Sequence, residues 1–239
     1  MAKRVGVILA GCGHRDGSDI RETTLVLLAL DRAGAEAICV APDMAQPAVA
    51  NHQTSDVTQP KPRRSVMAES ARLARGQVRK LAELDAGEID ALIIPGGWGA
   101  AVHLSNYADK AAVCDVNPDV ARLLKGMLSS RRPIGLLSMA AVLGARVLGP
   151  VAGVRLTLGS KAFHAAKHAA VMGADVRPCS PDDVLVDEKN RVFTAPASMF
   201  DDARFAQTSI GIERLVRGVL AAAKDRHPAP VAPPAPLAK

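Results

Sequence analysis

The sequence of 239 residues is poor in aromatic side chains, with one tryptophan, one tyrosine and four phenylalanines. Proteins that bind single-stranded nucleic acid interleave such residues with cations, so that bases can stack on them. The densest cationic segment, residues 61–80, carries seven cations against one acidic residue and has no aromatic residue. We therefore expect no nucleic-acid partner, and we interpret this segment as a solvated helix face.

Long apolar runs are also lacking, because glycine, proline or charge interrupts each run before the roughly 18 residues of a membrane span. The N-terminus is similar to an export signal, since Lys3 and Arg4 precede an apolar stretch at residues 5–10. That stretch is shorter than the roughly 7 to 15 residues of a signal-peptide core. We interpret it as a buried strand, and we expect no membrane partner.

The chain has only four cysteines, and they are separated by 27, 75 and 65 residues. None of them forms the close pairs that zinc ligation or a redox motif requires. We therefore expect no metal site and no cofactor. Without a credible signal peptide, we expect reduced thiols and a cytoplasmic location.

Short β-branched runs alternate with longer amphipathic segments, a pattern that predicts an α/β fold of parallel strands connected by helices. The expected strands are residues 5–10, 37–41, 91–94 and 134–137, followed by an edge hairpin of residues 184–186 and 191–194. The expected helices are residues 20–32, 65–74, 117–130, 139–148, 161–172 and 201–224. We expect one domain over residues 1–226 and a disordered, proline-rich tail over residues 227–239.

Ligands of open parallel sheets bind beyond the carboxyl ends of the strands, so the loops at these ends are the place to look for a site. The first such loop contains Gly11-Cys12-Gly13 and ends at Asp19, with Glu22 early in the next helix. The third is a glycine loop at residues 95–100, and the fourth leads to Ser138. These three loops carry the candidate functional residues.

Ser138 lies between the apolar run 133–137 and the helix-forming run 139–143. A strand that breaks into a helix at a small nucleophilic side chain is the geometry of a nucleophile elbow. The backbone N–H groups of Gly96, Gly97 and Met139 are candidates for an oxyanion hole, because glycine lets the main chain approach a substrate closely. Ser138 is therefore the candidate nucleophile.

A serine hydroxyl needs a general base, because a helix dipole worth about 1 kcal/mol cannot generate an alkoxide. Glu22 is a candidate base if burial raises its pKa. His164 is a second candidate, 26 residues downstream of Ser138, whereas His103 and His168 have no better support. Cys12, at the end of the first strand, is an alternative nucleophile.

Two further residues are pocket candidates. Trp98 follows the glycine pair, so we expect it to line the pocket. Asp19 is most simply a helix-cap residue, but its carboxylate could also bind a polar substrate.

These motifs resemble the ElbB family of isoprenoid-biosynthesis-associated glyoxalases, over residues 5–220. The family belongs to the superfamily of the parkinsonism-associated deglycase and the PfpI-type proteases, which have a class I glutamine amidotransferase-like fold. The stretches that carry the resemblance are Gly11-Cys12-Gly13, Asp16-Gly17-Ser18, Ala41-Pro42-Asp43, Glu69-Ser70-Ala71-Arg72, Arg75-Gly76, Pro95-Gly96-Gly97, Gly99-Ala100-Ala101 and Leu104-Ser105-Asn106.

The resemblance implies a flavodoxin-like three-layer sandwich, with helices on both faces of a mostly parallel sheet, that is usually dimeric. It also implies a nucleophile on the elbow with the carboxylate of Glu22 beside it, and it adds Asn106 to the pocket candidates. The implied activity is that of a cofactor-independent, glyoxalase III-like lyase. Such an enzyme converts small dicarbonyls, glyoxal or methylglyoxal, to hydroxy acids.

The elbow departs from this family, because Ser138-Met139-Ala140-Ala141 stands where the family has cysteine followed by Ile-Ala-Pro. We therefore expect weak or altered activity on a small carbonyl compound, in a homodimer. Two alternatives remain open: a catalytically silent pocket protein with a binding or regulatory role, and a serine hydrolase.

Overall fold

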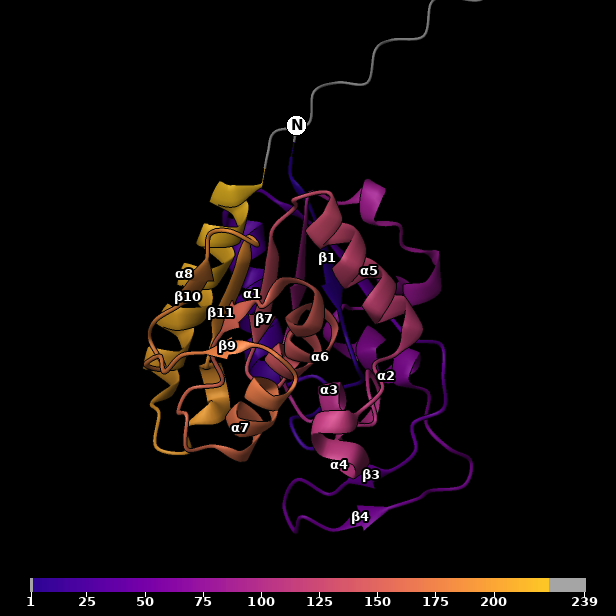
Figure 1. Ribbon diagram of the computed structural model, residues 1–239. Coiled ribbons are helices and arrows are strands. Elements are labelled where there is room, and N and C mark those ends of the chain that lie inside the picture. The colour runs from indigo at the N-terminus through magenta and orange to yellow at the C-terminus, as the bar shows by residue number, and fades with distance from the viewer. Residues whose placement is uncertain (1, 224–239) are drawn as a thin grey trace, which may run out of the picture.

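A seven-stranded sheet runs through the centre of the computed structural model, which describes residues 2–223, and helices cover both of its faces (Figure 1). The strand order is β10-β11-β7-β6-β1-β2-β5. The strands are β1 (Arg4–Ile8), β2 (Glu36–Ala41), β5 (Arg79–Lys80), β6 (Ala91–Ile94), β7 (Ile134–Leu137), β10 (Leu185–Asp187) and β11 (Val192–Ala195). Each neighbouring pair is parallel except β10 and β11. The predicted α/β class, flavodoxin-like sandwich and edge hairpin are confirmed.

The helices are α1 (Ile20–Arg32), α2 (Val66–Leu73), α3 (Gly99–Val102), α4 (Tyr107–Lys110), α5 (Pro118–Ser129), α6 (Ala140–Ala152), α7 (His164–Val171) and α8 (Phe205–Ala222). Four 3-10 turns complete them: η1 (Leu81–Glu83), η2 (Ala86–Glu88), η3 (Ala111–Val113) and η4 (Ala197–Met199). Among residues 2–223, no helix combines the length and hydropathy that crossing a membrane requires.

Two apolar clusters form the core, one on each face of the sheet. Helices α1 and α8 pack on one face, where Val5 and Val7 of β1 point. Helices α5, α6 and α7 pack on the other face, where Ile8 of the same strand points. Alternate residues of a strand point to opposite faces, so a strand buried on both faces reads as a continuous apolar run. This explains why residues 5–10 imitate a signal peptide.

Local sequence signals set the ends of the helices that carry the site. Asp19 caps α1, because its carboxylate accepts hydrogen bonds from the N–H groups of Arg21 and Glu22. Helix α6 ends at Gly153, whose φ of 58° is left-handed. The first helical turn after Asp19 thus carries Glu22 at a fixed position at the carboxyl edge of the sheet.

Two pairs of short strands were not predicted: β3 (Val49–Ala50) with β4 (Val57–Thr58), and β8 (Arg155–Leu156) with β9 (Asp175–Val176). Two residues give no alternation from which a strand could be recognised. The helix predicted from residue 201 begins later, at Phe205. Its predicted end at Lys224, the domain limit at residue 226 and the tail at residues 227–239 lie outside the described residues.

Candidate active site

Ser138 forms a sharp turn between β7 and α6. Its φ of 49° is in the left-handed region, which is unfavourable for a residue other than glycine. Its N–H donates a 2.9 Å hydrogen bond to the carbonyl oxygen of Ala195 at the end of β11. This bond ties the turn to the neighbouring strand, and the surrounding structure holds the strained backbone in place.

Glu22 is fully buried and lies beneath the glycine loop. Its Oε2 accepts a 2.8 Å hydrogen bond from the Gly96 N–H, and its Oε1 accepts a 3.2 Å bond from the Ser198 N–H. A Cβ placed on Gly96 would lie 2.6 Å from Glu22 Oε2 and 2.7 Å from Ser138 Oγ. The carboxyl group and the hydroxyl therefore both lie close to Gly96, although no hydrogen bond joins them among the described residues.

The pKa of Glu22 is raised to about 7, chiefly because burial disfavours the charged form and also because of the nearby charge of Asp19. The backbone hydrogen bonds from Gly96 and Ser198, together with the Ser198 hydroxyl, act in the opposite direction on this pKa. A carboxyl group with such a pKa can both release and accept a proton near neutral pH, as proton-transfer catalysis requires.

The predicted oxyanion-hole donors differ in their availability. The Gly96 N–H is already engaged by Glu22 Oε2. The N–H groups of Gly97 and Met139 donate to no acceptor among residues 2–223. Gly97 has a φ of 101°, and a side chain there would clash with the carbonyl oxygen of Gly17, so this position requires glycine. Met139 precedes α6, where the helix dipole favours negative charge.

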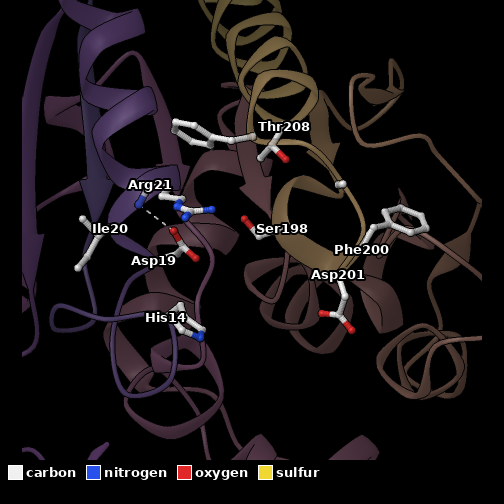
Figure 2. Close-up of a pocket in the computed structure, with 10 residues that line it drawn as sticks. His14, Asp19, Ile20, Arg21, Ser198, Phe200, Asp201 and Thr208 are labelled. Carbon is white, nitrogen blue, oxygen red and sulfur yellow. Dashed lines mark hydrogen bonds between the residues drawn. The ribbon is translucent and has the colours of Figure 1, made fainter. Parts of the chain in front are cut away.

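A cavity of about 480 Å³ lies next to the site, because Ser198, which hydrogen-bonds the Glu22 carboxyl group, is one of its lining residues. Figure 2 shows Asp19 and Arg21, from the start of α1, facing Ser198 across this cavity. Its lining residues are His14, Asp19, Ile20, Arg21, Ser198, Phe200, Asp201, Ala203, Phe205 and Thr208. Ser138 is only 5% exposed and is not among them.

The other predicted pocket residues lie around the first loop (residues 9–19) but in separate cavities. Cys12 lines a cavity of about 510 Å³ together with His52 and Arg72. Burial raises the pKa of its thiol, which disfavours the reactive thiolate. Trp98 and Asn106 line a third cavity of about 470 Å³. Of the four predicted pocket candidates, only Asp19 therefore borders the cavity next to Glu22.

The candidate histidine bases are held elsewhere. His103 bonds the carbonyl oxygen of Ala10 through Nδ1 at 2.7 Å, and His168 bonds the hydroxyl of Tyr107 at 2.8 Å. His164 is the first residue of α7. None of the three makes a hydrogen bond with the Ser138 hydroxyl among the described residues. The serine-hydrolase alternative thus lacks a histidine hydrogen-bonded to Ser138 among the described residues.

Ser198 and His14 are two of the residues lining this cavity that were not predicted. Ser198 follows β11, and its N–H and hydroxyl both contact the Glu22 carboxyl group. It lies after the carboxyl end of a parallel strand, so the rule that selected the other loops could have found it, but no motif marks it. His14, in the first loop, lies edge-on to His52 with ring centroids 4.9 Å apart.

No family model matches the chain. Two curated relatives cover most of it. The mitochondrial ES1 protein homolog of Rattus norvegicus is 39% identical over 225 residues, which cover 91% of this chain and 83% of the relative. The human mitochondrial "glutamine amidotransferase-like class 1 domain-containing protein 3" is 39% identical over 227 residues, which cover 92% of this chain and 83% of the relative.

Solved structures agree with these relatives. An isoprenoid biosynthesis protein with an amidotransferase-like domain from Ehrlichia chaffeensis has a TM-score of 0.86 and 31% identity, covering 92% of this chain and 99% of that one. A DJ-1 superfamily protein from Agrobacterium tumefaciens has a TM-score of 0.52, 20% identity and coverages of 93% and 89%. The second likeness shows the fold alone.

The cytoplasmic location expected from the sequence is contradicted by these comparisons, because the relatives from rat, human and Danio rerio are all named as mitochondrial proteins. The expectation rested on widely spaced cysteines and a short N-terminal apolar stretch, and these features describe a folded core rather than a compartment. The identity to these relatives and the share of each chain that is covered show the family: the chain belongs to the class I glutamine amidotransferase-like family of the ES1 proteins.

Proposed function

We propose that the protein is an ElbB-type enzyme that converts glyoxal or methylglyoxal to the hydroxy acid without a cofactor, slowly because a serine occupies the elbow. The observation that carries this proposal is that Ser138 Oγ and Glu22 Oε2 both approach the position of a Cβ on Gly96, at 2.7 and 2.6 Å. The raised pKa of Glu22, about 7, supports it, because only such a carboxylate is basic enough to assist a serine hydroxyl.

The reaction with glyoxal begins when Ser138 Oγ attacks one aldehyde carbon and gives its proton to the Glu22 carboxylate. The oxygen that develops negative charge is stabilised by the N–H groups of Gly97 and Met139, and its protonation completes a hemiacetal. Removal of the hydrogen from the attacked carbon gives an enediol, and protonation of the neighbouring carbon gives a hydroxyacyl ester of Ser138. Water then releases glycolate. Electrons move only within the substrate, so no external oxidant or reductant takes part.

The test compares the rate of dicarbonyl consumption by the wild type, Ser138→Ala, Glu22→Gln and Ser138→Cys. We expect a low wild-type rate that both Ser138→Ala and Glu22→Gln abolish. Ser138→Cys should be faster by about tenfold or more, because a thiol with a pKa of about 8.5 ionises far more readily than an alcohol. Circular dichroism and thermal unfolding of each variant check that it is folded.

A second candidate function, a silent pocket with a binding or regulatory role, is favoured by one observation. Ser138 is 5% exposed, and its hydroxyl makes no hydrogen bond with a base among the described residues. If the wild type and Ser138→Ala are equally inactive while Ser138→Cys turns over, the natural chain is a pocket protein without a working nucleophile. In either case we propose a homodimer, which light scattering tests as a mass twice that of the chain.

A further inference from the structure

The cavity of about 470 Å³ is separate from Ser138 and Glu22, neither of which lines it. It lies where the first loop meets the β3–β4 hairpin and the helices α3 and α4, which Figure 1 shows at the same end of the molecule. Among the residues that line it are Asp16, Val57, Trp98, His103, Asn106 and Asp109. It is therefore a candidate site in its own right.

His103 brings an unpartnered hydrogen-bond acceptor to this cavity. The side chain is 4% exposed, and its Nδ1 lies 2.7 Å from the carbonyl oxygen of Ala10, so Nδ1 carries the proton and donates it. Burial lowers the pKa of His103, which keeps the ring neutral. In this tautomer Nε2 is an acceptor, and it has no hydrogen-bond partner among the described residues.

Asp16 brings a second hydrogen-bond acceptor without a donor to this cavity. The residue is 8% exposed, and its Oδ2 accepts a 2.8 Å hydrogen bond from the Ala50 N–H, whereas Oδ1 has no hydrogen-bond partner among the described residues. His52 Nε2 lies 3.7 Å from Oδ1. It supplies no proton, because it accepts from the Arg15 N–H while Nδ1 donates to the Ala50 carbonyl. A buried polar atom without a partner is unfavourable, and a ligand donor would relieve this.

The donors of the cavity lie in its exposed wall, where Arg15, Gln59 and Trp98 carry N–H groups, whereas its buried atoms without a hydrogen-bond partner are acceptors. The Ser105 hydroxyl donates to the Ala100 carbonyl, and both ends of the Asn106 amide bond Asp115. The charged side chains of the lining are Asp16, Asp109 and Arg15, so the net charge is negative. Trp98 is 40% exposed and supplies an aromatic face of the kind that attracts cations.

We propose that this cavity binds a small organic cation, a primary ammonium on a short apolar chain. The ammonium donates to His103 Nε2 and Asp16 Oδ1, and the apolar part packs against Trp98 and Val57. The ligand matches three features of the cavity: its buried polar atoms without a hydrogen-bond partner are acceptors, its net charge is negative, and its exposed wall is partly aromatic and aliphatic. The site is independent of the activity proposed for Ser138 and Glu22.

Trp98 is the only tryptophan in the sequence, so its fluorescence reports directly on this cavity. The full chain is titrated with n-butylammonium chloride, and n-butanol and sodium butyrate serve as neutral and anionic probes of matched length. We expect a saturable change in emission with n-butylammonium alone. Asp16→Asn keeps an oxygen for the Ala50 N–H but removes the charge, and should weaken binding about tenfold or more.

Asp109→Asn is the matched control, since it makes the same carboxylate-to-amide change at a side chain without a buried orphan atom, and should weaken binding by about threefold or less. If Asp16→Asn does not fold, Trp98→Leu at its exposed position tests the same site by calorimetry, with an expected loss of about threefold or more. The proposal is overturned if n-butylammonium shows no saturable binding, if n-butanol binds equally well, or if the variants at positions 16 and 98 bind like the wild type.

Discussion

At the scale of single residues, the buried carboxyl group of Glu22 determines what the site can do. Its pKa of about 7 in the folded protein lies above its ordinary value of 4.5, because burial disfavours the charged form. The folded protein therefore holds a proton that the unfolded chain has already released between these two pH values. Stability must fall as the pH rises through this window.

Glu22→Gln should remove this pH dependence, because the amide has nearly the same shape and no charge. We expect the stability of the wild type relative to Glu22→Gln to fall by about 3 kcal/mol between pH 4 and pH 8. Urea unfolding of both proteins at a series of pH values measures this difference. Parallel curves for the two proteins would contradict a raised pKa.

Gly96→Ala tests the close approach of Glu22 and Ser138. The new methyl group would lie 2.6 Å from Glu22 Oε2 and from Ser138 Cβ, so one of them must move. We expect a loss of about 1–3 kcal/mol in stability and of the dicarbonyl activity. Gly34→Ala is the control, because its new methyl group meets no atom within 4 Å, and its positive φ costs only stability. Full activity in Gly96→Ala would disprove the packing described here.

At the scale of elements, α1 carries both the cap and the charge that act on Glu22. Asp19→Ala should cost about 1 kcal/mol, because the hydrogen bonds to the Arg21 and Glu22 N–H groups are lost. Asp19→Asn keeps a capping oxygen, so its stability should change less. Both variants remove the charge of Asp19, so the pH midpoint of activity should shift downwards in both. An unchanged midpoint would mean that Asp19 does not contribute to the pKa of Glu22.

The elements that sequence patterns predict well are the long ones. The helix at residues 20–32 matches α1 residue for residue, because its cap, its apolar spacing and the following Gly34 agree. The hairpin of β3 and β4 was not predicted. Its strands have two residues each, which is too few to show an alternating pattern, and both residues of β4 are exposed. Because that hairpin forms part of the cavity lined by Trp98, the sequence patterns did not predict this cavity either.

The candidate site was predictable only in part, for a similar reason. Ser138 and Glu22 are marked by local patterns, a strand-to-helix break and an early-helix carboxylate, and the fold brings the two together. Ser198 has no local signal, and its role depends on β11 lying beside β7. The partner of the Gly96 N–H also depends on tertiary contact, which a motif does not contain.

At the scale of the whole molecule, the site depends on a sheet that is buried on both faces. Leu92 and Ile93 are adjacent in β6 and fully buried, but they belong to the apolar clusters on opposite faces. If the chain is one domain, as the sequence predicts, Leu92→Ala and Ile93→Ala should each cost about 2–5 kcal/mol in one cooperative transition. Calorimetry tests this expectation, and two separate transitions would contradict a single domain.

The same sheet gathers the loops that follow β1, β6, β7 and β11 at one edge, as parallel strands require. Glu22, Gly96, Ser138 and Ser198 are far apart in sequence and meet there. The fold thus explains the position of the candidate site, and in the proposed function the identity of residue 138 sets the rate of its chemistry.

The central claim, that Ser138 is the nucleophile and Glu22 its base, is tested most directly by mass spectrometry of the protein quenched during turnover of glyoxal. The account predicts a hydroxyacyl ester on the peptide that contains Ser138, formed by the wild type and absent from Glu22→Gln. Turnover without an adduct on Ser138, or with the adduct on Cys12 instead, would contradict it.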